Sequence, residues 1–337
     1  MINHRIVLAS RPVVEASLDN FRLESAEVPA LAEGEVLVRQ HYMSLDPYMR
    51  GRMSESKSYA APQVLGVVMQ GGAVGEVIQS RHAGFAVGDK VIGSGGWQEY
   101  SVVDANQPGA LRKIDTTHIP ISAYLGAVGM PGVTAWVGLN HFIAAKAGET
   151  IVVDAASGAV GGVLGQLAKA RGCRAVGLAG GADKCAYVVD ELGFDACIDY
   201  KKFPDFASLA AALDKAAPAG VDGLFENVGG LILNVVLSRM NAFGRVAVCG
   251  MISGYDGAPT PITEPRLILT QRLKVQGFIV SEHLEMWPPA LGELGGLVAT
   301  GKLKYRETVA QGIAAAPEAF LGLLKGRNFG KQLVKLI

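Results

Sequence analysis

The sequence has few cysteines, few aromatic residues and no excess of charge of either sign. Its 337 residues include four cysteines, 7% aromatic residues, and 31 lysines and arginines that balance 31 aspartates and glutamates. A net charge of zero gives no broad basic field, which argues against nucleic acid or an anionic membrane surface as a partner. We therefore expect a small molecule as the partner.

The cysteines and the apolar runs exclude further classes of protein. Cys173, Cys185, Cys197 and Cys249 form no CxxC pair, so neither a disulfide framework nor a cysteine zinc lobe is expected. The start of the chain lacks the apolar core of a signal peptide. The most apolar stretch, 151–164, is broken by Asp154 and glycines and is too short to cross a membrane. These absences predict a protein of the reducing cytoplasm with no membrane segment.

The first third of the chain has the pattern of a β domain. Residues 1–126 lack a long helical period and contain short apolar runs separated by Gly, Pro and Asp. Strands are expected at 35–39, 64–68, 75–78, 90–92 and 100–103. Short strands at this spacing predict an all-β barrel or sandwich.

From about residue 150, apolar strand-like runs alternate with helical stretches. Helices are expected near 159–170, 183–192, 205–216, 231–240 and 283–300. This alternation predicts an α/β fold with a doubly wound parallel sheet, the dinucleotide-binding arrangement. The residues from Leu303 return to short strand-like pieces, which suggests a tail that pairs with the first domain. We therefore expect one domain at 1–126 plus 302–337 and a second at 127–301.

A glycine turn follows the first strand of the second domain. The segment IVVDAASGAVGG, residues 151–162, is a buried-strand pattern that leads into a helix. Backbone amides at such a turn and the helix N-terminus can bind a pyrophosphate, here through Gly158, Ala159, Val160 and Gly161. Ala156 stands where the strict GxGxxG pattern has its first glycine. A tight turn without a ligand is the alternative.

The end of the next strand favours NADP(H) over NAD(H). NAD-binding proteins commonly carry an acidic residue there for the ribose 2′-hydroxyl, whereas this chain has LAGGA at 178–182, followed by Asp183 and Lys184. Lys184 could therefore bind a 2′-phosphate, and Tyr200 could contact the adenosine. Alternatively, Asp183 caps a helix, Lys184 is a solvated surface residue and Tyr200 covers the sheet edge.

Several motifs together resemble a known family. They are the glycine turn, SLDPYMR at 44–50, GMPGVTA at 129–135, ENVGG at 226–230, CGMISGY at 249–255, GFIV at 277–280 and NFGK at 328–331. The chain is similar to zinc-independent medium-chain dehydrogenase/reductases, and most of all to the prostaglandin reductase / leukotriene B4 dehydrogenase group with its bacterial curcumin-reductase members. The resemblance implies NADPH-dependent saturation of the C=C bond of α,β-unsaturated ketones and aldehydes. It also implies a GroES-like β-barrel substrate domain, a Rossmann domain and a homodimer.

The same resemblance assigns residues to the cofactor. Asn227 would lie in a turn after the fourth strand of the Rossmann domain, and Cys249, Gly250 and Ser253 would follow the fifth. Backbone groups from Phe278 to Val280 would hold the nicotinamide, and Asn328 would reach the cofactor from the tail. Without the family, Asn227 could be an ordinary turn residue and Asn328 a cap.

The chemistry requires a hydrogen-bond donor and no metal. His4, His41, His82 and His118 have no ligand spacing, and the position of Gly-His-Glu in zinc alcohol dehydrogenases of this superfamily reads GVV at 66–68. Hydride addition to the β-carbon of an enone builds negative charge on the carbonyl oxygen, which a neutral tyrosine hydroxyl can stabilise. We expect Tyr255 first and Tyr48 second in this role, although Tyr48 could equally line the core.

The candidate substrate wall is large and soft, which favours a hydrophobic enone or enal. Its members are Met43, Tyr48, Met53, Met130, Met251, Ile252 and Trp287, and core packing is the alternative for most of them. Arg50 and Arg52 are expected to be solvated rather than anion-binding. Two rival functions stay open, an NADPH quinone reductase and a non-catalytic NADPH-binding protein.

Overall fold

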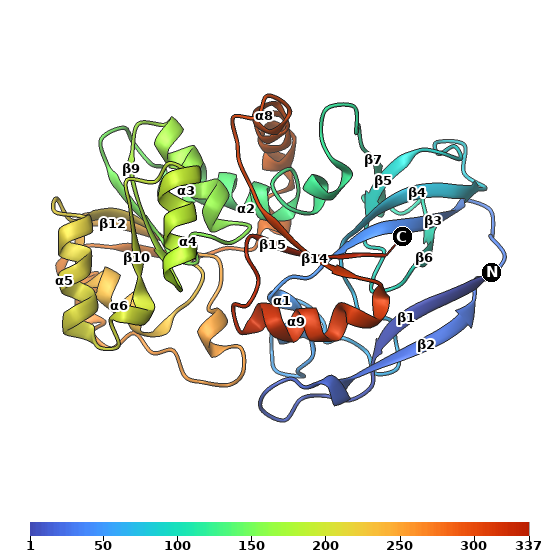
Figure 1. Cartoon of the computed structure of the whole chain (residues 1–337), viewed down its shortest axis with the longest axis horizontal. Helices are drawn as coiled ribbons and strands as arrows, with labels where there is room; N and C mark the ends of the chain where they lie inside the picture. The colour runs from blue at the N-terminus through green and yellow to red at the C-terminus, as the bar shows by residue number, and fades with distance from the viewer. Residues whose placement is uncertain (337) are drawn as a thin grey trace. The chain divides into compact units, whose positions relative to one another are not determined.

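The computed structural model describes residues 1–336, and the chain divides into two compact units (Figure 1). Unit 1 contains Met1–Leu125, Glu307–Asn328 and the residues from Gln332 onward. Unit 2 contains Gly126–Arg306 and Phe329–Lys331.

Unit 1 is built on antiparallel strands. Strands β1 (Ile2–Leu8) and β2 (Phe21–Glu27) form one antiparallel pair. A seven-stranded sheet has the order β14-β15-β3-β4-β5-β7, with β6 also paired to β3. Its strands are β3 (Glu35–Ser44), β4 (Ala73–Ser80), β5 (Lys90–Gly93), β6 (Tyr100–Asp104), β7 (Leu111–Lys113), β14 (Glu307–Gln311) and β15 (Lys331–Lys335). Leu333 in β15 lies opposite Ser44 in β3, so the tail pairs with the first part of the chain as expected.

Three aromatic rings fill the core of unit 1. Phe21 stacks on Trp97 with ring centroids 5.6 Å apart, and Phe320 meets Trp97 edge-on at 5.5 Å. Phe320 belongs to helix α9 (Ala316–Leu324), a helix in a stretch where the sequence suggested only short strands. The expected strand at 64–68 is also absent: the segment is a turn with exposed Val64 and Val67, joined to Val7 by one bridge at Val68.

Unit 2 contains a six-stranded parallel sheet with the order β10-β9-β8-β11-β12-β13. Its strands are β8 (Thr150–Val153), β9 (Arg174–Ala179), β10 (Ala196–Asp199), β11 (Val221–Glu226), β12 (Met240–Val248) and β13 (Lys274–Gly277). The strand order reverses direction at β8, because β9 and β10 lie to one side of it and β11 to β13 to the other. Ligands bind outside the carboxyl ends of strands at such a switch point.

Helices cover both faces of this sheet, so unit 2 has the expected doubly wound parallel arrangement. One face packs on α2 (Met130–Val137), α3 (Gly161–Ala170) and α8 (Trp287–Ala299), and the other on α5 (Phe206–Ala216) and α6 (Gly230–Leu237). Some predicted bounds were wrong. The helix expected at 183–192 is a short α4 (Ala182–Ala186) with a π-helical turn after it, and Met240 begins β12 rather than ending α6.

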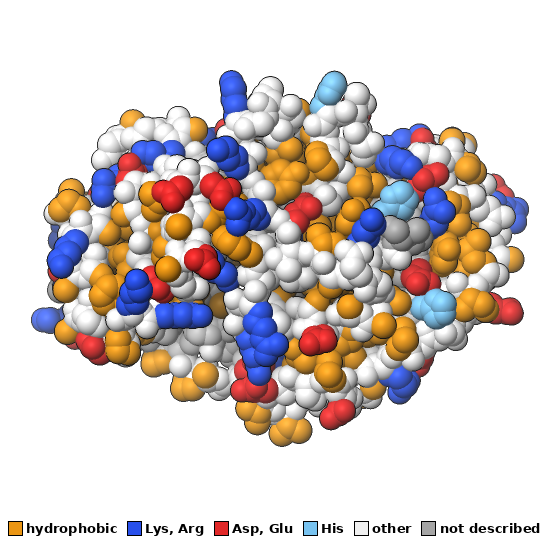
Figure 2. All heavy atoms as spheres, viewed as in Figure 1, with side chains coloured by type: hydrophobic (Ala, Val, Ile, Leu, Met, Phe, Trp, Pro, Cys, Tyr) orange, Lys and Arg blue, Asp and Glu red, His pale blue; other side chains and the backbone are white. Residues whose placement is uncertain are grey.

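Three further observations concern the chain as a whole. Among residues 1–336, no helix is long and apolar enough to cross a membrane. In the same range, no three His, Cys, Asp or Glu side chains are grouped so that they could hold a metal ion. On the face drawn in Figure 2, basic and acidic side chains are interspersed and form no continuous basic field.

Candidate active site

The phosphate loop connects β8 to α3 and is closed by backbone hydrogen bonds. The Gly158 amide donates to the Ala155 carbonyl at 2.8 Å, and the Ala156 amide donates to Leu178 at the end of β9 at 3.0 Å. A Cβ atom on Gly161 would lie 2.6 Å from the Ala155 oxygen, so only glycine fits the start of α3. Helix α3 begins at Gly161, two residues after the start expected at 159, and residues 158–160 form the turn before it.

A segment near the end of the chain packs on this loop within unit 2. The Gly330 amide donates to the Ser157 carbonyl at 3.2 Å. Phe329 packs edge-on against Tyr187 with centroids 4.9 Å apart, and the Arg306 guanidinium lies over both rings. Gly330 has a positive φ of 71°, and a Cβ atom there would be 2.0 Å from the Arg306 oxygen. The sequence singled out the NFGK motif, but it did not predict this contact.

Two lysines lie at the tip of β9. Burial and the charge of Lys201 lower the pKa of Lys184, in that order of size. A Cβ atom on Gly180 would lie 2.9 Å from Cε of Lys201 and 2.8 Å from the Tyr200 hydroxyl. Lys201 and Tyr200 therefore lie over Gly180 at the strand tip, whereas no atom lies within 4 Å of a Cβ position on Gly181. Two cations that repel one another beside an open backbone suit an anion such as a phosphate.

Lys201 is a candidate that the sequence analysis missed. It follows Tyr200 directly at the end of β10, and this position is distant in sequence from the strand tip it covers. The Asp199 carboxylate orders this corner, because it accepts the amide of Gly181 at 2.8 Å and that of Lys201 at 3.3 Å. Burial is the largest cause that raises the pKa of Tyr200, and the neighbouring Asp199 carboxylate raises it further.

Asn227 lies in the turn between β11 and α6. Its side-chain amide donates to Asp154, at 3.0 Å to Oδ1 and 3.2 Å to the carbonyl. Its own carbonyl accepts the Ile252 amide at 3.0 Å. The residue thus joins the ends of β8 and β11 to the segment that follows β12. Asp154 was not among the site residues expected from the sequence.

The segment after β12 lies at the same edge of the parallel sheet, where the carboxyl ends of the strands meet. We call this edge the ligand edge. The amides of Cys249 and Gly250 both donate to the Glu226 carbonyl, at 2.9 and 3.1 Å, and the Ser253 hydroxyl donates to the Val228 carbonyl. Burial raises the pKa of the Cys249 thiol to about 12, so this cysteine is a neutral thiol at pH 7. A Cβ atom on Gly250 would lie 3.2 Å from the Tyr255 hydroxyl, which places that hydroxyl over the end of β12.

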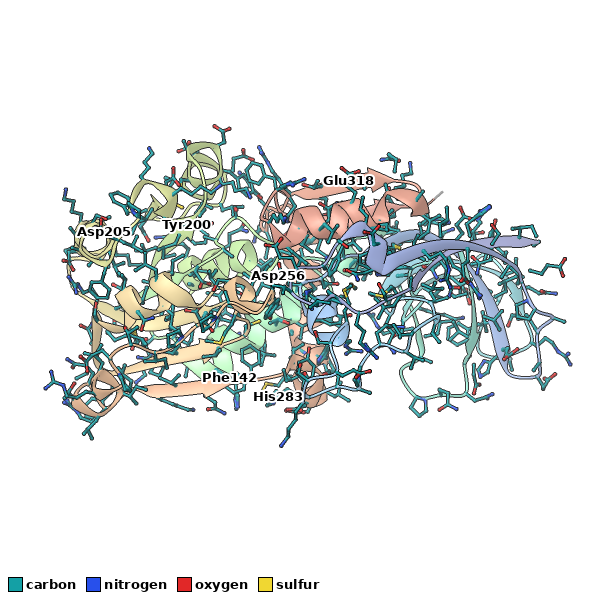
Figure 3. All side chains as sticks on the ribbon, turned by 90° about the horizontal axis from the view of Figure 1, so that it is seen from below. Phe142, Tyr200, Asp205, Asp256, His283 and Glu318 are labelled. Carbon is teal, nitrogen blue, oxygen red and sulfur yellow. The ribbon has the colours of Figure 1, made fainter. Side chains whose placement is uncertain are left out.

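The residues after β13 are tied to the core. Phe278 stacks on Phe142 with centroids 4.4 Å apart, and His283 meets Phe142 edge-on at 5.3 Å (Figure 3). The Phe278 amide donates to Val248 at 3.2 Å, and the Val280 carbonyl accepts the Trp287 indole N–H at 3.1 Å. The position of residues 278–280 is therefore fixed by a stacked ring pair and by Trp287.

Two of the expected site residues, Tyr48 and Asn328, belong to unit 1. Tyr48 begins helix α1 (Tyr48–Arg52), with the Arg52 guanidinium 5.0 Å from its ring centre. Burial raises the pKa of Tyr48 well above its ordinary value, so its hydroxyl is protonated at neutral pH. Asn328 lies in the loop between α9 and β15.

In unit 1, two methionines expected in the substrate wall and one arginine expected at the surface are buried instead. Met43 and Met53 are fully buried among core side chains, so they pack the interior and form no substrate wall. Arg50 is buried rather than solvated: its guanidinium donates to the Val14 carbonyl at 2.6 Å and to the Ser54 hydroxyl at 3.1 Å. Arg50 is buried because it lies on the short helix α1, whereas Met43 belongs to β3 and Met53 follows α1.

These features define a dinucleotide-dependent dehydrogenase or reductase, and comparisons with known proteins agree. The family model described as the N-terminal domain of oxidoreductase matches residues 4–111, and the model described as zinc-binding dehydrogenase matches 159–295. NADPH-dependent curcumin reductase of Escherichia coli (strain K12) is 43% identical over 341 residues, covering 99% of this chain and 97% of that protein. Prostaglandin reductase 1 of Rattus norvegicus is 42% identical over 322 residues, covering 94% of each.

A solved structure shows the same similarity. The structure of CurA from Vibrio vulnificus in complex with NADPH is 42% identical, covers 99% of both chains and has a TM-score of 0.92. The chain therefore belongs to the medium-chain dehydrogenase/reductase family of NADP-dependent reductases. The resemblance to the prostaglandin reductase and curcumin reductase group is confirmed.

Proposed function

We propose that this chain catalyses the NADPH-dependent reduction of the C=C bond of α,β-unsaturated ketones and aldehydes. The observation that carries this proposal is the similarity to NADPH-dependent curcumin reductase over 99% of the chain, which leaves no domain unaccounted for. The reaction is an oxidoreduction of a small, largely apolar molecule. The half-buried Met130 and Trp287 of unit 2 are candidates for apolar contact with it.

The residues of unit 2 fit NADPH. The Gly158–Gly161 turn offers backbone amides and the N-terminus of α3 to the pyrophosphate, and Lys184 and Lys201 offer charge to the 2′-phosphate. Tyr200 is proposed to contact the adenosine, and Asn227, Cys249, Gly250 and Ser253 are proposed to contact the nicotinamide half. Residues 278–280 would hold the carboxamide, and Asn328 of unit 1 is proposed as a further contact.

When bound, NADPH supplies the hydride that adds to the β-carbon of the substrate. The task of the protein is to bind the carbonyl oxygen with a donor that is present before charge develops there. The hydroxyl of Tyr255 is proposed for this role, with Tyr48 as second candidate. Each is a phenol whose O–H can donate a hydrogen bond to that oxygen, and burial keeps Tyr48 protonated by raising its pKa.

An assay with a panel of substrates tests this function. Purified protein is mixed with NADPH and either an enone, an enal or a quinone, and the loss of NADPH absorbance is followed together with the products. We expect the enone and the enal to be turned over faster than the quinone, with a saturated carbonyl compound as product. Faster quinone turnover would make the protein a quinone reductase, and no oxidation at all would make it a non-catalytic NADPH-binding protein.

We further propose that the enzyme works without zinc, as a homodimer, in the cytoplasm. Residues 1–126 with 302–337 are proposed as the GroES-like barrel that binds substrate, and 127–301 as the Rossmann domain. The first domain contains no cysteine, and all four cysteines of the chain are free thiols. Treatment with a strong chelator should leave the rate unchanged, and light scattering should give twice the mass of the chain.

A further inference from the structure

Two carboxyl groups lie next to one another in the interior of unit 2. Asp154 follows β8 and Glu226 ends β11, and both residues have no exposed surface. The Val228 amide donates to both groups, to Glu226 Oε1 at 2.7 Å and to Asp154 Oδ2 at 3.1 Å, so the two carboxyl groups converge on one N–H. Two ionised carboxylates this close in a dry interior repel one another, whereas a carboxylic acid can donate to a neighbouring carboxylate.

The hydrogen bonds around the pair leave one carboxyl oxygen without a donor. Glu226 Oε1 accepts the amides of Val228 at 2.7 Å and Gly229 at 2.5 Å, as an ionised carboxylate does. Glu226 Oε2 is buried and receives no donor from any other group of the described chain. Asp154 Oδ1 accepts the Asn227 amide at 2.7 Å and Oδ2 accepts the Val228 amide at 3.1 Å, so a proton shared between Asp154 and Glu226 Oε2 supplies the partner that Oε2 lacks.

Among the described residues, the donors to the two carboxyl groups are uncharged amides of residues 227–229, and no cation forms an ion pair with either group. The titratable groups that act on the pair are the Cys249 thiol after β12 and the Tyr200 phenol after β10. Both are neutral at pH 7, because burial raises the pKa of each. Burial and the neighbouring Glu226 raise the pKa of Asp154 well above its ordinary value. Like charges at this separation in a dry interior favour the shared proton.

We propose that Asp154 and Glu226 form a carboxylic acid–carboxylate pair that shares one proton and fixes the Asn227–Gly229 turn at the ligand edge. The turn directs three consecutive amides at the pair, since the Asn227 amide donates to Asp154 Oδ1 at 2.7 Å and the next two donate to Glu226. Asp154 also begins the phosphate loop. The pair therefore joins the loop proposed for the pyrophosphate to the turn proposed for the nicotinamide half.

Asp154 and Glu226 are positioning residues in this proposal. Only the expected effect of the pair on cofactor binding rests on the cofactor site proposed above. The shared proton itself can be tested on the protein without any cofactor or substrate. Failure of these tests is thus distinguishable from failure of the proposed reductase activity.

The first test is infrared spectroscopy of the native protein between pH 6 and 8. We expect the carbonyl stretch of an un-ionised carboxylic acid to persist across this range and to vanish in Asp154→Asn. Asp222→Asn is the matched control, because Asp222 lies at the other end of β11 and accepts the Thr150 amide at 2.8 Å, away from the pair. It should keep the band. A wild-type spectrum without this band above pH 6 would overturn the proposal.

The second test is the pH dependence of stability. A carboxyl group with a raised pKa in the folded state weakens folding as pH rises from its unfolded pKa of ~3.9 toward the folded pKa. Asp154→Asn keeps a donor toward Glu226 Oε2 and removes this titration. The folding equilibrium constant of the variant, divided by that of the wild type, should then rise by up to about tenfold per pH unit. A ratio that does not change with pH would contradict the shared proton.

The third test addresses the turn. Asp154→Ala removes the acceptor of the Asn227 amide, so amide hydrogen exchange at Asn227–Gly229 should speed up by about tenfold or more. Asp154→Asn retains a carbonyl acceptor and should restore protection. Equal protection in all three proteins would show that the pair does not hold the turn. If the alanine variant fails to fold, the infrared and stability measurements on Asp154→Asn still decide whether a proton is shared.

Discussion

At the scale of single residues, Tyr255 carries the most direct chemical prediction. Replacing it with phenylalanine removes the donor proposed for the substrate oxygen and should lower kcat by about 10²- to 10³-fold. NADPH affinity should stay within about twofold, because the ring and its packing remain. Tyr124→Phe serves as control, since its hydroxyl donates to the Asp115 carbonyl in unit 1. Unchanged turnover in Tyr255→Phe would transfer the role to Tyr48, to be tested in the same way.

The lysine pair at the tip of β9 gives a second prediction at this scale. Lys184→Ala and Lys201→Ala should each weaken NADPH binding by about tenfold, as expected for one charge-assisted contact, and leave NADH binding almost unchanged. Lys202→Ala is the control, because this neighbour carries the same charge but the atoms nearest to Gly180 belong to Tyr200 and Lys201. The lowered pKa of Lys184 adds a pH effect: its charge is lost at lower pH than in an ordinary lysine, so NADPH affinity should fall as pH rises through that pKa. Equal losses for both nucleotides, measured by titration calorimetry, would exclude a 2′-phosphate site here.

At this scale, the sequence analysis named candidate residues that belong to a local motif. It missed candidates whose position depends on the fold. Lys184 follows a strand tip whose residue types can be read directly. Lys201 and Asp154 come from other strands, and their roles depend on which strand ends are neighbours in the sheet. In the sheet, the end of β10 lies beside that of β9, and the end of β8 lies beside that of β11. No short segment of sequence encodes this strand order.

At the scale of elements, the phosphate loop predicts a steric effect. Gly161→Ala would place Cβ 2.6 Å from the Ala155 carbonyl, so the loop must shift. We expect a loss of ~1–3 kcal/mol of unfolding free energy and weaker NADPH binding. Gly292→Ala in α8 is the matched control, because no atom lies within 4 Å of its Cβ position, and alanine should there add ~0.5–1 kcal/mol. Chemical denaturation measures both; equal effects of the two substitutions would mean that the loop tolerates a side chain.

Helices and strands were predicted best where the apolar residues of a segment followed a single period. Unit 2 alternates apolar strands of four to nine residues with amphipathic helices. The Asp205 carboxylate caps α5 by accepting the Ser208 amide. The prediction failed where tertiary packing decided the outcome. The apolar run at 64–68 has strand composition, but it is a turn in which Gly66 takes a positive φ of 73°. Helix α9 is short, and its Phe320 is held in the core of unit 1 by Trp97 and Phe21.

At the scale of the whole molecule, the path of the chain predicts how cofactor binding acts on stability. The chain passes from one unit to the other after Leu125, Arg306, Asn328 and Lys331. The residues proposed for the phosphates all belong to unit 2, but we expect two units linked by four chain crossings to unfold together. We therefore expect one cooperative thermal transition. NADPH at 100 times its Kd should stabilise the folded state by ~2.7 kcal/mol.

Differential scanning calorimetry checks this prediction with matched nucleotides. NADH at the same concentration lacks the 2′-phosphate and should raise Tm much less than NADPH does, because Lys184 and Lys201 then have no anion to bind. In a Lys184→Ala/Lys201→Ala protein the two nucleotides should become equivalent, which separates the phosphate contribution from that of the shared remainder of the dinucleotide. Two separate transitions, of which NADPH moves only one, would show that the units unfold independently despite the crossings. An equal rise with NADH in the unaltered protein would contradict the lysine pair as the source of cofactor preference.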